Sequence, residues 1–85
     1  MSSSVAANRE AIRNDIDTAR VILDRHAVLV GEAYKELSML AIITMNAVEF
    51  LSRPMKGQYD DIGVYRELRK AILKAEQAVA GARAA

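Results

Sequence analysis

The stretch from Leu37 to Leu51, LSMLAIITMNAVEFL, decides the fold of this chain. Eleven of its fifteen residues are apolar, and Glu49 is its only charged residue. The apolar residues do not alternate as they do in a strand; they occupy nearly every side of a helix. A helix of this kind must be covered all round or lie in a membrane. Because a membrane span needs about 20 apolar residues, we expect a core helix with more than one neighbour, and no membrane association.

A heptad pattern extends this helix toward the N-terminus. Nearly all of the residues at alternating spacings of four and three are apolar, in one register from Ile12 to Leu51. They are Ile12, Ile16, Ala19, Leu23, His26, Val30, Ala33, Leu37, Leu40, Thr44, Ala47 and Leu51. The unbroken register favours one continuous helix over residues 8–51, with Gly31 as the site of any kink. The alternative is a break between His26 and Gly31, which would give a three-helix bundle.

A second, shorter helix follows a loop. Pro54 ends the long helix because proline lacks the amide donor and clashes with the preceding turn, so residues 52–60 are predicted to form a loop. Asp60 and Asp61 are candidate helix caps, with charges that favour a helix start, and a helix is predicted over residues 61–80. We expect this helix to fold back antiparallel on the first and to cover outward-facing apolar residues. These are Met39, Ile42 and Met45.

The two ends of the chain are predicted to pack little. Residues 1–7 are small and uncharged, and we expect a flexible start with Ser4 or Asn8 as the first helix cap. Residues 81–85 are rich in alanine and are predicted to fray. With 85 residues in all, the chain makes one small helical domain over residues 1–85.

The residues that flank the heptad positions indicate how many helices meet. In a two-stranded coiled coil they are charged, whereas many here are apolar, which is typical of bundles of three or four helices. The fold class is therefore all-α. We favour a helical hairpin, one long and one shorter helix, that forms a homodimeric bundle. The residues predicted to carry interaction or oligomerisation are Leu23, His26, Val30, Leu37, Leu40, Ile43, Thr44, Ala47 and Leu51.

Composition argues against several functions. The chain has no cysteine, one histidine and a net charge of +1, so it lacks thiolate zinc ligands and a strong attraction to polyanions. His26 has no carboxylate three or four residues away, which favours a structural histidine over a metal ligand. No catalytic or phosphate-binding motif is present. We expect no metal, no cofactor and no enzymatic activity. The opening residues lack the layout of a secretory signal, so we expect a cytoplasmic protein.

The basic residues of the second helix raise one further hypothesis. Arg66, Arg69, Lys70 and Lys74 lie on or near one face of that helix. Such a face is more often solvated than bound to nucleic acid, and no aromatic residues are interleaved with these. The favoured function is therefore a non-enzymatic protein–protein interaction module, such as an adaptor, regulator or chaperone-like protein. The alternative is a small nucleic-acid-associated regulator that uses this basic face.

Overall fold

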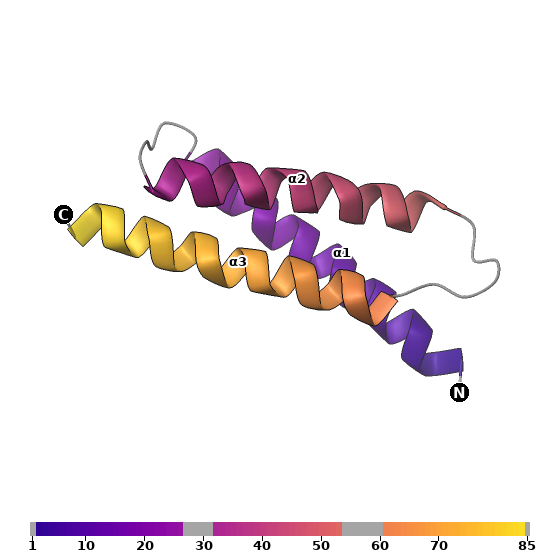
Figure 1. The fold of residues 1–85 in the computed structure, drawn as a ribbon. Coiled ribbons are helices and arrows are strands. Elements are labelled where there is room, and N and C mark those ends of the chain that lie inside the picture. Colours follow the sequence, from indigo (N-terminus) through magenta and orange to yellow (C-terminus); the bar gives the residue numbers. More distant parts are fainter. Residues whose placement is uncertain (1, 27–31, 54–60, 85) are drawn as a thin grey trace.

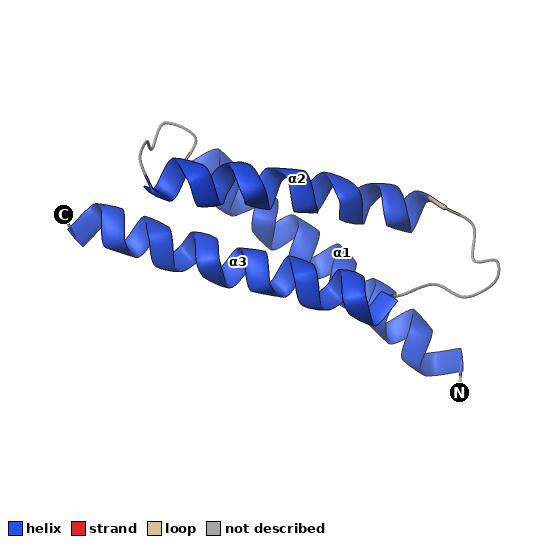
Figure 2. Cartoon of the chain, viewed as in Figure 1, coloured by secondary structure: helices blue, strands red, loops and turns tan. Residues whose placement is uncertain are grey.

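Three helices run alternately up and down in the computed structural model, which describes residues 2–26, 32–53 and 61–84 (Figures 1 and 2). They are α1 (Ser2–Arg25), α2 (Glu32–Ser52) and α3 (Asp61–Ala84). Each helix packs against the other two. In Figure 1, α2 runs antiparallel to both α1 and α3, and the two chain ends lie at opposite ends of the bundle. The described part of the chain contains only helices as regular secondary structure, which confirms the all-α class and fits the three-helix alternative.

The favoured continuous helix over residues 8–51 is not found. Helix α1 ends at Arg25, where the amide of His26 donates to the carbonyl oxygen of Ile22 at 3.1 Å. A straight helix over residues 8–51 would be about 66 Å long, whereas the longest dimension of the molecule is 47 Å. The chain instead reverses, so that the two halves of the heptad pattern face each other within one molecule. The predicted kink at Gly31 lies outside the described residues.

Most of the described residues of the heptad pattern are buried, whereas Leu23, His26 and Leu51 are half-buried. The core combines the first and second halves of the pattern with an apolar row of α3. Leu40, Ile12 and Leu68 are fully buried and come from three different helices. Among the described residues, the buried cluster comprises Ile12, Ile16, Ala19, Leu37, Leu40, Ala47, Leu68, Ala71, Ile72, Ala75 and Val79. The single heptad register of residues 12–51 therefore marks the inward side of both α1 and α2, because both helices pack on the same core.

The helix boundaries differ from the predictions mainly at the outer ends. Helix α1 already begins at Ser2, so the predicted caps Ser4 and Asn8 lie inside it. Helix α3 is described from Asp61 and extends four residues beyond position 80, to Ala84, while Asp60 lies outside the described residues. Helix α2 ends at Ser52. Most of the predicted loop, residues 54–60, lies outside the described residues.

A buried arginine joins the first helix to the end of the second. The Nη2 of Arg9 donates to the carbonyl oxygen of Leu51 at 2.9 Å, and its guanidinium lies 5.3 Å from the centre of the Phe50 ring. The last carbonyl groups of a helix have no partner within the helix, and the helix dipole is negative there. Arg9 therefore caps α2 with both a hydrogen bond and a favourable charge.

Candidate interaction surface

The outward side of α2 is apolar and exposed. Met39, Ile42 and Met45 have exposed fractions of 50%, 54% and 71%, so the prediction that the C-terminal helix covers them is wrong. Met39 lies at the edge of this side, next to α3, whereas Ile42 and Met45 face away from α3. Helix α3 packs on a different side of α2, where Ile43 and Ala47 line a shared hollow with α3. Within the described residues, the outward side of α2 therefore has no intramolecular cover.

A second heptad row lies on this outward side. Tyr34, Ser38, Ala41, Met45 and Val48 are spaced four, three, four and three apart. Tyr34, Met45 and Val48 are exposed, and the two small residues between them are half-buried. This row was not predicted from the sequence, although its spacing is visible there, because the same helix carries the stronger core row. Two such rows on one helix are typical of a helix with neighbours on two sides.

The row borders a groove between α1 and α2. Leu23 of α1 and Val48 of α2 contribute apolar walls, and the rim carries one charge of each sign, from Arg20 and Glu49. The residues that line the groove are Arg20, Leu23, Ala41, Thr44, Met45, Val48 and Glu49. An apolar groove beside an exposed apolar row is a surface on which another helix can pack.

Most residues predicted for interaction are occupied within the single chain. Leu37, Leu40, Thr44 and Ala47 are buried in the core of the bundle. Leu23, Ile43 and Leu51 are half-buried and pack against that core. The hydroxyl of Thr44 donates to the carbonyl oxygen of Leu40 at 2.7 Å, so it satisfies itself locally. A partner that used the buried residues would have to open the bundle.

Two of the residues predicted for interaction remain, Val30 and His26. Val30 is outside the described residues. His26 is half-buried at the end of α1, in a shallow hollow that it shares with Ile22 of the same helix and Glu76 of α3. Within residues 2–26, 32–53 and 61–84, no three histidine or acidic side chains gather closely enough to hold a metal ion.

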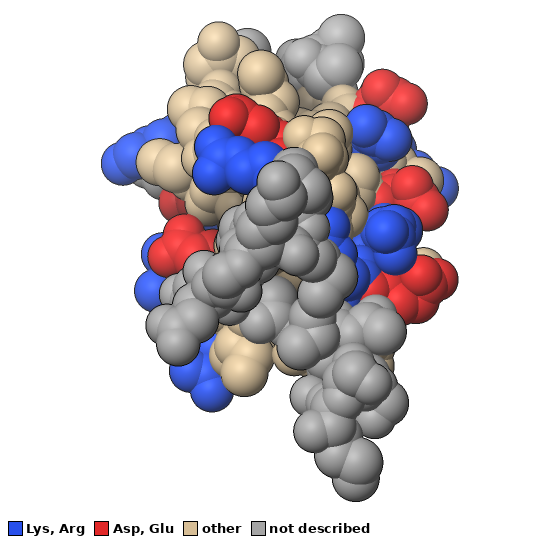
Figure 3. Space-filling model, turned by 90° about the vertical axis from the view of Figure 1, so that its right-hand side faces the viewer, with Lys and Arg blue, Asp and Glu red and all other residues tan. Residues whose placement is uncertain are grey.

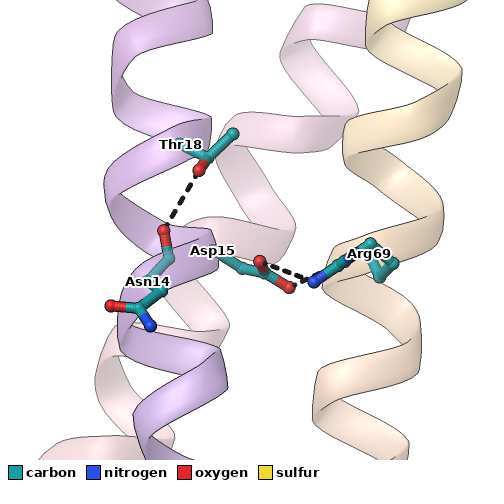
Figure 4. Close-up of polar contacts among 4 residues, drawn as sticks. All are labelled: Asn14, Asp15, Thr18 and Arg69. Atoms are coloured by element: carbon teal, nitrogen blue, oxygen red, sulfur yellow. Dashed lines mark hydrogen bonds and ion pairs between the residues drawn. The ribbon is translucent and has the colours of Figure 1, made fainter.

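The predicted basic face loses one of its four residues. Arg69 turns toward α1 and donates to Asp15 (Figure 4), with 3.1 Å from Nε to Oδ2 and from Nη2 to Oδ1. Its hydrogen bonds to Asp15, and then the charge of that carboxylate, raise the pKa of Arg69. Arg66, Lys70 and Lys74 remain exposed along α3. Figure 3 shows basic and acidic side chains intermixed on the face that it presents.

Comparison with known proteins does not assign the chain to a family. No protein-family model matches the chain, and neither a curated protein nor a solved structure shows significant similarity to it. The fold and surface define a small three-helix bundle with one uncovered helix face. None of its described helices combines the length and the apolar character that a membrane crossing requires. The cytoplasmic location stays a prediction.

Proposed function

We propose that this protein is a non-enzymatic protein–protein interaction module that binds through the outward side of α2. The observation that carries this proposal is the exposed apolar row from Tyr34 to Val48, together with the neighbouring Ile42. Soluble monomers rarely expose contiguous apolar surface of this kind unless it contacts a partner. The row costs free energy while it faces water, and a partner that covers it removes that cost.

The spacing of the row indicates how a partner binds. Anchors at intervals of three and four residues are typical of helix-to-helix recognition. Ser38 and Ala41 leave room for a close approach in the middle of the row, while Tyr34 and Met45 supply larger contacts toward its ends. Methionine is unbranched and adapts to irregular surfaces, which suits a recognition surface.

Site-specific photo-crosslinking in cells tests this proposal. A photoreactive amino acid replaces Met45 in one variant and Lys74, an exposed residue of α3, in a matched control. We expect a discrete crosslinked protein species at position 45 and none at position 74, because only the first position lies on the apolar row. Equal labelling at both positions, or no discrete species at position 45, would contradict the proposal.

The alternative function, association with nucleic acid, rests on three exposed cations. Arg66, Lys70 and Lys74 follow one another at four-residue spacing along α3. In a titration of labelled duplex DNA, three phosphate contacts predict a slope of log affinity against log salt of about −2.7. The Lys70→Ala/Lys74→Ala variant should reduce that slope to about −0.9. No measurable binding at low salt would remove this alternative, and Glu67 beside these cations already weakens it.

A further inference from the structure

We propose that the partner on the outward side of α2 is a second copy of this chain, docked antiparallel about a two-fold axis beside Ala41 and Ile42. This inference rests on the proposed function, because it names the occupant of the same surface. It differs from the dimer expected from the heptad pattern, whose core row is buried inside each molecule. The interface proposed here uses the second row and leaves each three-helix core intact.

Side-chain size supports an antiparallel pair. The second row is nearly symmetric about Ala41, with Ser38 and Met45 on either side of it. An antiparallel copy places the small Ser38 opposite the partner's Met45, and Tyr34 opposite the partner's Val48. Ala41 lies at the axis, where a small residue lets the two backbones approach. On both sides of the axis, Met45 of one copy then fills the space left by Ser38 of the other, as close packing requires.

Charge supports the same arrangement. By helix periodicity, Lys35 and Glu49 lie on the same flank of the row as Ile42, seven residues before and seven residues after it. Lys35 is at the edge toward α3, and Glu49 is at the rim of the groove toward α1. In an antiparallel pair, Lys35 therefore lies opposite the partner's Glu49, and the two-fold axis repeats this ion pair. Ile42 lies between the two ion pairs and meets its own copy. A parallel pair would keep Lys35 and the partner's Glu49 about 21 Å apart along the helix axis.

One existing contact of Glu49 bears on this pairing. Its Oε1 accepts a hydrogen bond from Arg53 Nη2 at 2.9 Å, and both side chains are more than half exposed. Exposed ion pairs of this kind contribute little, and a carboxylate has a second oxygen with which it accepts further donors. Glu49 is therefore available to Lys35 of a second copy without losing Arg53.

The size of the surface determines how strongly we expect the two copies to associate. The row from Tyr34 to Val48 is about 21 Å long and one helix wide. That is smaller than the roughly 800 Å² per partner of a typical stable interface. We therefore expect a reversible dimer with a dissociation constant in the micromolar range, formed from monomers that are already folded.

Sedimentation equilibrium over low to high micromolar concentrations tests the surface. The parent should shift from monomer to dimer, and Met45→Asp should stay monomeric, because it places a charge in an apolar contact. Met39→Asp is the matched control, since Met39 is also exposed but lies on the side of α2 toward α3. It should dimerise as the parent does. Circular dichroism of each variant verifies that the helices remain folded. We expect both variants to fold, because both substituted positions are exposed.

A charge exchange tests the orientation. Lys35→Glu and Glu49→Lys should each weaken self-association by about tenfold, because two exposed attractions worth a few tenths of a kcal/mol each become repulsions. An equimolar mixture of the two variants should recover the parent affinity as a heterodimer, since every glutamate then faces a lysine. A mixture no tighter than the single variants would overturn the antiparallel pairing.

The outcomes separate this inference from the proposed function. A parent that stays monomeric at high micromolar concentration overturns the second copy as the occupant. If Met45 then still crosslinks to a different protein in cells, the interaction surface stands and its partner is another chain. If position 45 gives no discrete species and the parent stays monomeric, both proposals fail.

Discussion

Arg69 of α3 and Asp15 of α1 form a two-pronged ion pair across fifty-four residues of sequence, with both N–O distances at 3.1 Å. The Asp15 side chain is only 10% exposed, whereas that of Arg69 is half exposed. The guanidinium also lies 5.2 Å from the centre of the Tyr65 ring. Because this geometry uses two parallel hydrogen bonds, it sets the position of α3 along α1 as well as attracting it.

Removal of the Asp15 carboxylate should destabilise the bundle. Asp15→Ala leaves the guanidinium of Arg69 without its acceptor, so its melting temperature should fall clearly below that of the parent. Asp17→Ala is the matched control, because Asp17 lies on the exposed side of the same helix. A double-mutant cycle with Arg69→Ala measures the coupling between the two side chains. Additive effects of the two substitutions would show that the ion pair contributes nothing.

The pH dependence of this pair follows from the raised pKa of Arg69, which its hydrogen bonds to Asp15 cause. A pKa raised on folding adds stability that is fully present below the unfolded pKa and is lost only as pH rises through the folded pKa. For an arginine both values lie far above neutrality. The difference in melting temperature between the parent and Asp15→Asn should therefore stay constant from about pH 6 to pH 9. A difference that shrinks across this range would contradict the assignment.

Truncation of the buried Leu40 should destabilise the protein far more than truncation of the half-exposed Met39 beside it. Leu40 is fully buried among all three helices, and Leu40→Ala should lower the free energy of unfolding by about 2–5 kcal/mol. Met39→Ala removes a half-exposed side chain next to it and should cost clearly less. Urea denaturation of both variants measures the difference. Similar losses in the free energy of unfolding would mean that Met39 is covered in solution. Leu40→Asp should prevent folding altogether, because it places a charge in the core.

Loss of the Arg9 cap should weaken the junction of α1 with the end of α2. Arg9→Ala removes the hydrogen bond to the Leu51 carbonyl and the contact with Phe50, and should cost about 1.5–3 kcal/mol. Arg13→Ala is the control, because Arg13 is exposed and pairs with Glu10 one turn away. Hydrogen exchange should show faster opening at the C-terminal turn of α2 in the first variant only. Equal protection in both variants would exclude a capping role.

The three-helix arrangement shows what a heptad pattern can predict and what it cannot. Ile12, Ile16 and Ala19 were predicted to share a row with Leu37 and Leu40, and all five are buried in one core. The spacing identifies the inward side of each helix because backbone geometry repeats every few residues. It does not state whether the row continues or folds back on itself. The prediction that the C-terminal helix covers Met39, Ile42 and Met45 was wrong for the same reason. The spacing of residues shows which side of a helix is apolar, but not which helix packs against that side.

The helical class, most of the inward-facing residues and the apolar surplus on α2 could be predicted from the sequence. These depend on propensity and on short-range periodicity, which are properties of neighbouring residues. Three features follow only from the way the helices pack: the chain reverses after Arg25, Arg69 leaves the basic face for Asp15, and α3 leaves Met45 uncovered. Each of these depends on which helices meet. That choice is made by the packing of residues far apart in the chain, and no local spacing contains it.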